Sequence, residues 1–339
     1  MAEPNFLTIA GKTYERLNDG QPYFLGRWFE KEIDGACHQC TTTDGALVFF
    51  AVEGSTFFQA DFTDVTHIRE PYFAYSIDGG EPVRRHISEG TVALPDAGLH
   101  AVRLIADGMT EGEGKFYEEI GFALRRVTVS AEGRMYGIKP TAPLVFYYGD
   151  SITEGVRAIS MAADSDGNSA THAYPWYCSE ALGVTPYYIG YGASGMIRPG
   201  WFHTMEKAID YLSWRYMVEE SPAANQKPDL IVINHGTNDQ DFPMMDFLNA
   251  LRATLSHLYK KYPDVPVVYV IPLQQVFATL IRRVMAEYPR GYVVESESWR
   301  VTFTDGIHPN AAGARVMGEG VAEAIKGLGI LPETNSASE

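Results

Sequence analysis

The sequence contains little cysteine and no long apolar segment. Its three cysteines are an odd number, and Cys37 and Cys40 form a lone C-x-x-C with no second ligand pair. Neither a disulfide framework nor a zinc site is therefore predicted. No segment is long and apolar enough to span a bilayer, and the N-terminus lacks the basic and apolar regions of a signal peptide. These absences predict a cytoplasmic protein, or a secreted one whose leader has been removed.

Positive charge is also scarce. The 27 Lys and Arg residues face 43 Asp and Glu residues, which gives a formal net charge of −16. Nucleic acids and anionic membranes select basic surfaces, so neither is expected as a partner. No paired His, Asp or Glu spacing of a metal site is present, and the one Gly-rich segment lacks the rest of a nucleotide fingerprint. We therefore expect no metal and no cofactor, and a neutral small-molecule substrate; the oligomeric state is not predicted.

The chain changes character near residue 140. Before that point, short strand-like runs are separated by turn signals about every ten residues, which is typical of a β-sandwich. From Leu144 onward, strand-like and helix-like segments alternate, which predicts a parallel sheet covered on both faces. The predicted strands are 144–148, 185–189, 230–234, 266–271 and 291–295, and the predicted helices are 173–182, 205–219, 245–262, 276–288 and 310–327. We expect a β-sandwich accessory domain over 1–138, a catalytic domain over 139–331 and a disordered tail over 332–339.

Four polar segments follow predicted strands or loops of the second half. They are Gly149-Asp150-Ser151-Ile152-Thr153, the run 190–195 with Gly192, the run 236–239 with Asn238, and Asp305-Gly306-Ile307-His308-Pro309. Taken singly, each could be an ordinary turn or helix cap. In α/β sheets, however, ligands bind at the carboxyl ends of the strands, where these segments are expected to lie.

In this order the four segments resemble the four blocks of the SGNH (GDSL-type) hydrolases, over about residues 140 to 328. The resemblance implies an α/β fold with a three-layer αβα domain, Ser151 as nucleophile and His308 as base. It also implies an oxyanion hole made by the backbone N–H groups of Ser151 and Gly192 and the side-chain amide of Asn238. Asp305 stands three residues before His308, so a tight turn could bring its carboxylate to the imidazole and complete a triad.

Several neighbouring residues are expected to be structural. Asp150 and Asp239 are interpreted as turn and cap residues that hold the loops. His38 and His100 are expected at the surface or rim of the β half. Trp214 is placed in the predicted helix 205–219 and is expected in the core.

The layout of a β-sandwich (jelly-roll-like) before an SGNH domain resembles the two-domain carbohydrate esterases of family two. This resemblance implies a serine esterase that removes O-acetyl groups from plant polysaccharide-derived oligosaccharides of the xylan or mannan type, with a small acetylated carbohydrate as its partner. Trp201 and Trp299 flank the blocks and could stack on sugar rings, or simply pack. An SGNH acyltransferase, or a lipase, arylesterase or thioesterase acting on other esters, remains an alternative.

Overall fold

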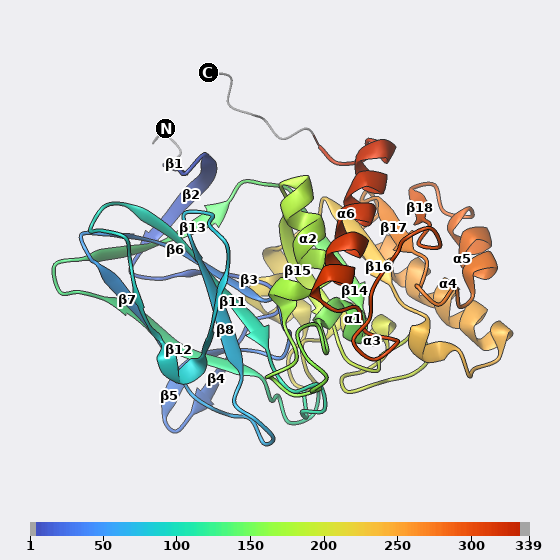
Figure 1. Ribbon diagram of the computed structural model, residues 1–339, viewed down its shortest axis with the longest axis horizontal. Coiled ribbons are helices and arrows are strands. Elements are labelled where there is room, and N and C mark those ends of the chain that lie inside the picture. The colour runs from blue at the N-terminus through green and yellow to red at the C-terminus, as the bar shows by residue number, and fades with distance from the viewer. Residues whose placement is uncertain (1–4, 333–339) are drawn as a thin grey trace.

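The computed structural model of the protein describes residues 5–332. It has a β-sandwich formed by the first part of the chain and a three-layer α/β part formed by the rest (Figure 1). The mixed α/β fold with a parallel sheet after a β-sandwich confirms the predicted fold class. The predicted tail 332–339 lies, apart from residue 332, outside the described residues.

The sandwich consists of two antiparallel sheets. Within the described residues the larger sheet has eight strands and the smaller has five. The larger contains β1 (Phe6–Ile9), β2 (Lys12–Asp19), β3 (Tyr23–Leu25), β6 (Leu47–Glu53), β8 (Tyr72–Ile77), β9 (Val83–His86), β11 (His100–Gly108) and β13 (Arg134–Pro140). The smaller contains β4 (Phe29–Ile33), β5 (Ala36–Thr41), β7 (Phe57–Phe62), β10 (Thr91–Ala93) and β12 (Phe122–Val129).

The second part holds a parallel sheet in the order β15-β14-β16-β17-β18. Its strands are β14 (Leu144–Gly149), β15 (Thr185–Gly190), β16 (Leu230–Asn234), β17 (Val267–Val270) and β18 (Gly291–Val294). Its helices are α1 (Ser151–Glu154), α2 (Tyr174–Leu182), α3 (Met205–Asp210), α4 (Met244–Lys261), α5 (Ala278–Met285) and α6 (Ala311–Leu328). Short 3₁₀ turns are η1 (Ile87–Glu89), η2 (Ala170–His172), η3 (Val218–Glu220), η4 (Pro222–Asn225) and η5 (Thr237–Asp239).

The parallel sheet is buried on both faces. One face packs against α2 and α6, through residues such as Val145, Val232 and Val321. The other packs against α3, α4 and α5, through residues such as Ile231 and Leu255. Apolar residues run continuously along these strands because neither face meets water.

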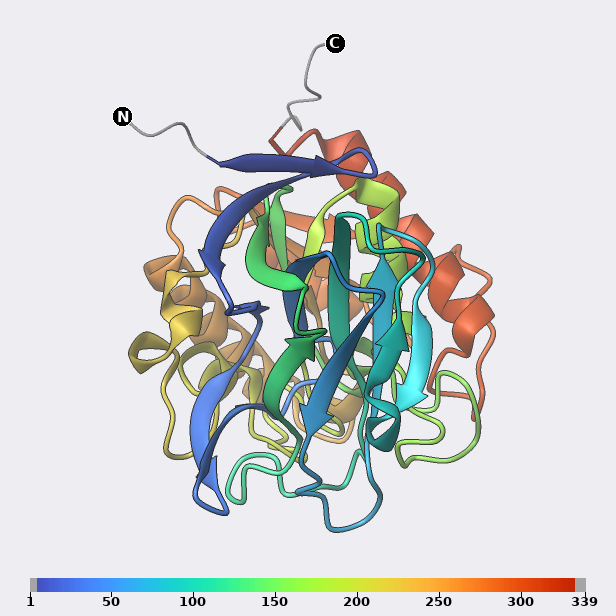
Figure 2. The same cartoon turned by 90° about the vertical axis from the view of Figure 1, so that its left-hand side faces the viewer.

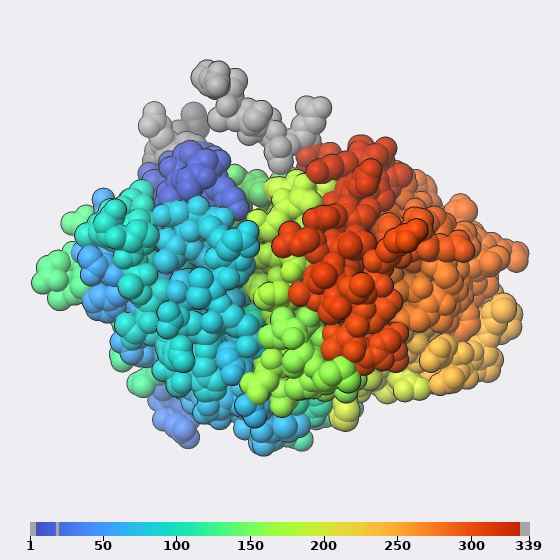
Figure 3. All heavy atoms as spheres, viewed as in Figure 1, coloured from blue at the N-terminus to red at the C-terminus, as the bar shows by residue number. Residues whose placement is uncertain are grey.

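The β-sandwich and the parallel sheet share one apolar core. Along β6, Phe50 and its alternating neighbours point into the interior of the sandwich, whereas Phe49 and Ala51 point to the opposite face. That opposite face belongs to the same core cluster as Phe146 of β14. The space-filling view shows the two parts meeting along a broad front (Figure 3), and Figure 2 looks onto the sandwich from its side of the molecule. The division at residue 138/139 stays a prediction, and β13 continues across it to Pro140.

One predicted helix is much shorter than expected. The segment 205–219 is helical only to Asp210, and Tyr211 then pairs with Met217 in an isolated β-bridge. Trp214 lies in the turn between them and is 51% exposed, so its predicted place in a helical core is wrong. The turn is held by the Trp214 N–H, which donates to the carbonyl of Phe116 in the sandwich, a contact that no local pattern reveals.

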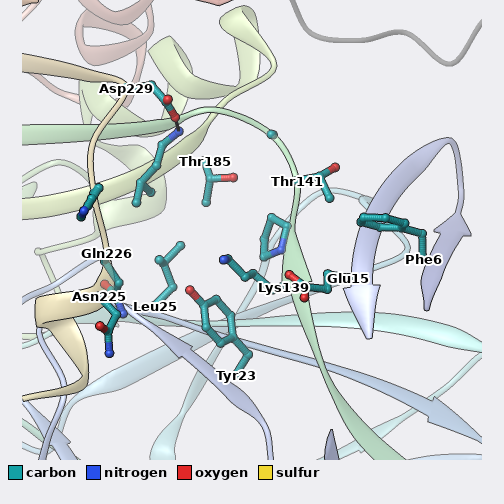
Figure 4. A pocket seen from close by; sticks show the side chains of 14 residues that line it. Phe6, Glu15, Tyr23, Leu25, Lys139, Thr141, Thr185, Asn225, Gln226 and Asp229 are labelled. Atoms are coloured by element: carbon teal, nitrogen blue, oxygen red, sulfur yellow. Dashed lines mark hydrogen bonds between the residues drawn. The ribbon is translucent and has the colours of Figure 1, made fainter. Parts of the chain in front are cut away.

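A cavity of about 450 Å³, lined by residues of both the sandwich and the α/β part, lies at the amino-terminal edge of the parallel sheet. Leu144 and Thr185, at the starts of β14 and β15, line it together with Tyr23 and Lys139 (Figure 4). The four sequence blocks lie at the carboxyl ends of the strands, so this cavity is at the opposite edge of the sheet.

Candidate active site

The register of the parallel sheet brings three of the four blocks together. Gly149 at the end of β14 pairs with Gly190 of β15 on one side and with Asn234 of β16 on the other. Ser151 and Gly192 each follow a paired glycine by two residues, and Asn238 follows Asn234 by four. These residues therefore leave the sheet at the same edge, where α/β folds bind their ligands.

Ser151 is the first residue of the short helix α1. The N-cap is Asp150, whose side chain accepts a hydrogen bond from the N–H of Ile152 at 3.0 Å, as expected for a cap. Gly149 precedes it because a Cβ at that position would lie 1.7 Å from the hydroxyl oxygen of Thr153. The tight turn presents Ser151, which is 5% exposed, at the tip of β14.

The loop before α6 brings His308 and Asp305 to Ser151. The Nε2 atom of His308 is 2.9 Å from Ser151 Oγ, and its Nδ1 atom is 2.8 Å from Asp305 Oδ2. The backbone N–H groups of Ile307 and His308 also donate to Asp305 Oδ1. A hydroxyl, an imidazole and a carboxylate are thus connected in series, an arrangement that can activate a nucleophile.

Arg157 shares the carboxylate of Asp305. Its guanidinium donates to Oδ2, the oxygen that also faces the imidazole of His308. Partial burial alone would raise the pKa of Asp305, but the hydrogen bonds from His308 and Arg157 outweigh it and hold this pKa well below its usual range. Asp305 is therefore ionised near neutral pH, and it keeps the Nδ1–H tautomer of His308 that leaves Nε2 facing Ser151.

The predicted oxyanion donors occupy ordered loops around Ser151. The Nδ2 group of Asn238 donates one hydrogen bond to the Ser194 carbonyl at 3.0 Å, which fixes the amide and leaves its second N–H available. Asp239 accepts from the N–H groups of Met196, Ile197 and Arg198, so it holds the loop after β15 as expected. The oxyanion role of Ser151, Gly192 and Asn238 stays a prediction.

His235, three residues before Asn238, is buried. Burial lowers its pKa to about 4, so the ring is neutral near pH 7. The ring also interacts with the backbone of Ser194, the residue whose carbonyl orients the Asn238 amide. His235 therefore supports the loop that positions Asn238.

A buried ionic cluster lies beneath α1. Lys115 and Glu154 are fully buried and form an ion pair, and Asp44 beside them is 1% exposed. Burial raises the pKa of Asp44 well above its ordinary value, and the charge of Glu154 adds to the rise. Burial also raises the pKa of Glu154, but the bonded ammonium of Lys115 opposes that rise, so we assign the proton to Asp44 and the charges to Lys115 and Glu154. The backbone of Gly192 also lies close to Glu154, so the cluster reaches the loop after β15.

The sandwich supplies part of the wall of the site. Glu111, in the loop after β11, packs on Gly192, since a Cβ added to Gly192 would lie 2.3 Å from Glu111 Cγ. A Cβ on the adjacent Gly112 would contact the Trp201 ring at 3.8 Å. Trp201 is 50% exposed, and its N–H donates to the Gly192 carbonyl at 3.0 Å. Trp201 thus lies beside the predicted catalytic loop with much of its ring open to solvent.

Trp299 lies in a different environment. It is half-buried, packs against the cluster between the sheet and α2 and α6, and lies next to Gly320 of α6. These contacts give it a packing role, and its stacking on substrate stays a prediction.

Sequence reasoning missed Glu111, Lys115 and Arg157. The first two come from a loop of the sandwich, and only the tertiary packing brings that loop to Ser151. Arg157 follows Ser151 by six residues and has a φ of 54°, an unfavourable value for a residue with a side chain. Its proximity to the first block was the one sequence signal available.

Comparison with known families agrees with this geometry. The model of the GDSL-like Lipase/Acylhydrolase family matches residues 147–316, about half of the chain, including Ser151, Gly192, Asn238, Asp305 and His308. The chain belongs to this family. None of the curated protein sequences matches it.

Solved structures with the same two-part architecture extend the similarity to the sandwich. A family two carbohydrate esterase from Clostridium thermocellum, in complex with cellohexaose, is 17% identical with a TM-score of 0.70, over 92% of this chain and 100% of that chain. An acetyl xylan esterase from Butyrivibrio proteoclasticus is 16% identical with a TM-score of 0.70, over 94% of this chain and 99% of that chain. A salicylyl-acyltransferase from a tetracycline biosynthetic pathway is 15% identical with a TM-score of 0.65, over 96% of this chain and 99% of that chain. At these identities the likeness establishes the shared fold of this GDSL-like protein.

In the described part of the chain, residues 5–332, no helix is long and apolar enough to cross a membrane.

Proposed function

We propose that this GDSL-like protein is a serine esterase that removes O-acetyl groups from plant polysaccharide-derived oligosaccharides of the xylan or mannan type. The observation that carries the proposal is the series of contacts from Ser151 Oγ to His308 Nε2 and from His308 Nδ1 to Asp305, at 2.9 and 2.8 Å. Membership of an acylhydrolase family supports ester cleavage as the reaction.

In the proposed mechanism Ser151 Oγ attacks the acetyl carbonyl while His308 Nε2 takes the hydroxyl proton. Asp305 holds the imidazole and stabilises the imidazolium that forms. The charge on the carbonyl oxygen would be bound by the N–H groups of Ser151 and Gly192 and by the free N–H of Asn238. As the bond from the acetyl carbon to the sugar oxygen breaks, His308 gives its proton to that oxygen and the sugar leaves with a free hydroxyl. Water then attacks the acetyl-enzyme while His308 takes its proton, and His308 returns that proton to Ser151 Oγ as acetate leaves.

The carbohydrate part of the proposal rests on Trp201 and on the similar structures. Half of the Trp201 surface is open beside the Gly192 loop, and an exposed indole stacks well on the apolar face of a sugar. Two of the similar structures are described as a carbohydrate esterase with bound cellohexaose and as an acetyl xylan esterase.

Acyl transfer is the second candidate, and the similarity to a salicylyl-acyltransferase favours it. A sugar or other hydroxyl could resolve the acyl-enzyme in place of water without any change in the roles of Ser151 and His308.

The experiment combines acetylated xylan and mannan oligosaccharides with 4-nitrophenyl esters of two to eight carbons. Mass spectrometry would follow acetate release and acyl transfer, and Ser151→Ala would be the inactive control. We expect acetate release and a fall in kcat/KM with chain length, since a small acyl site excludes long chains. A lipid-binding groove gains about 0.8 kcal/mol per buried CH₂. A steady rise from acetyl to octanoyl, with no acetate from either glycan, would refute the substrate assignment.

A further inference from the structure

The loop after β11 places a carboxylate at the candidate active site. Oε1 of Glu111 lies 2.5 Å from the position that a Cβ on Gly192 would occupy, so the carboxylate is in contact with the proposed oxyanion loop. The N–H of Glu111 is anchored to the carbonyl of Ala163 at 3.1 Å. The side chain is half-buried and so remains partly open to the site.

Two other carboxylates around the site are paired with cations. Asp305 is bound by Arg157, and Glu154 is bound by Lys115. Among residues 5–332 the Glu111 carboxylate has no direct hydrogen bond or ion pair, but the cationic groups of Lys115 and Arg157 lie near enough to lower its pKa and favour its charged form. Glu111 is thus a carboxylate at the edge of the site that has no cation bonded directly to it.

Desolvation makes this charge effective. Burial raises the pKa of the Glu111 carboxyl, and the negative charge of Glu154 adds to the rise. A partly desolvated charge is screened less by water and salt than a charge on the open surface. A second negative charge brought beside Gly192 would therefore meet appreciable repulsion.

We propose that Glu111, delivered by the β-sandwich, is a specificity-determining residue that selects uncharged esters and disfavours substrates carrying a carboxylate next to the scissile ester. The inference rests on the proposed esterase function and narrows its substrates to neutral sugars, as against acetylated uronic acids. The carboxylate can also accept hydrogen bonds from sugar hydroxyls, and charge-assisted bonds of this kind are the stronger ones.

The expected discrimination follows from Coulomb's law. Two like charges about 10 Å apart, at an effective dielectric constant of about 20, repel enough to change a rate constant roughly tenfold. The neutral-to-anionic ratio of kcat/KM should therefore fall about tenfold when the charge of Glu111 is removed.

The test compares 4-acetoxybenzoate with its methyl ester at pH 8, for wild type and three variants. Glu111→Gln should lower the ratio about tenfold, whereas Glu111→Asp, which keeps the charge, should retain most of it. Glu118→Gln is the matched control, because Glu118 lies on the same loop but is exposed and paired with His67. The two esters differ in intrinsic reactivity, but this difference cancels when the ratio of a variant is compared with the ratio of the wild type.

The proposal is overturned if Glu111→Gln changes the ratio less than threefold, or if Glu118→Gln lowers it equally. If Glu111→Gln fails to fold, the neutral-to-anionic ratio of kcat/KM can be measured for the wild type from about 20 mM to about 500 mM NaCl. Salt screens the charge of Glu111, so this ratio should fall as the salt concentration rises. A ratio that does not change with salt counts against the proposal. Both substrates are activated aryl esters, so their cleavage does not depend on the proposed carbohydrate substrate. Cleavage of these esters without cleavage of any acetylated glycan would refute the proposed substrate class. The effect of Glu111 on the ratio could still be measured in that case.

Discussion

Asp150, the residue before the candidate nucleophile, should make the stability of the fold depend on pH. Its side chain is 1% exposed; Oδ1 caps α1, and Oδ2 has no hydrogen-bond partner among the residues that the structure describes. Burial raises the pKa of Asp150 to about 7, against the opposing effect of the Ile152 N–H. The carboxyl is thus neutral in the folded protein under conditions where it is ionised in the unfolded chain.

The magnitude follows from linkage. A rise from 3.8 to about 7 is roughly three pKa units at about 1.36 kcal/mol each, or about 4 kcal/mol. Since the pKa in the folded protein is the higher one, the folded state binds more protons between these values. The contribution to stability is therefore fully present below about pH 4 and is lost as the pH rises to about 7.

Asp150→Asn isolates this contribution, because asparagine keeps the size of the side chain and the oxygen that caps α1 but does not ionise. The free energy of unfolding of the variant, relative to wild type, should rise by about 3–4 kcal/mol from pH 4 to pH 8. Urea denaturation followed by circular dichroism at steps of one pH unit measures it.

Asp64→Asn is the matched control, because Asp64 is exposed and also accepts a backbone N–H, that of Thr66 at 2.9 Å. The difference in the free energy of unfolding between Asp64→Asn and wild type should change little from pH 4 to pH 8. If the free energy of unfolding of Asp150→Asn differed from that of wild type by the same amount at pH 4 and at pH 8, the reasoning would be refuted.

Three further predictions concern the site and its support. Ser151→Ala and His308→Ala should each lose about 10⁴-fold in kcat on 4-nitrophenyl acetate, and Asn238→Ala about 10²–10³-fold; appreciable turnover by a folded Ser151→Ala would exclude the mechanism. Asp305→Ala should lower kcat less than His308→Ala does, because Asp305 only orients and stabilises the imidazole. Equal losses of kcat would show that the carboxylate is indispensable. Lys115→Met should lower the free energy of unfolding by about 3–5 kcal/mol in urea, because it leaves a buried carboxylate unpaired, and a loss below 1 kcal/mol would contradict the assigned charges.

The blocks that lie at strand ends were predictable from the sequence because local chemistry determines them. An apolar run followed by Gly149-Asp150-Ser151 specifies a buried strand, a tight turn and a capped helix, and all three are present. Long helices such as α4 were predicted to within a residue, since their apolar residues recur with helical period. The separation of Asp305 and His308 by three residues gave the contact seen between their side chains.

Residues whose environment comes from distant segments were not predictable. His38 and His100 were expected at the surface or rim of the β half, yet they are buried, at 3% and 7% exposed, so this expectation is wrong. His38 is within hydrogen-bonding distance of Thr63, and His100 of Asp78 and Asp96. Such partners allow a polar ring to be buried. Thr63 and Asp78 lie in loops more than twenty residues away along the chain, and periodicity does not show them.

The same argument applies to the sandwich as a whole. The sequence predicts an accessory module, because short strand-like runs and turn signals follow one another as in any β-sandwich. In the structure, Lys115 of the sandwich neutralises Glu154 of α1, and the face of β6 that holds Phe49 extends the core of the parallel sheet. Without the sandwich, Glu154 would be a carboxylate without its cation beneath the helix that begins with Ser151, and one face of the α/β core would be exposed. The unit that builds the site is therefore the whole described chain, and the loop with Glu111 is as much a part of it as the four sequence blocks.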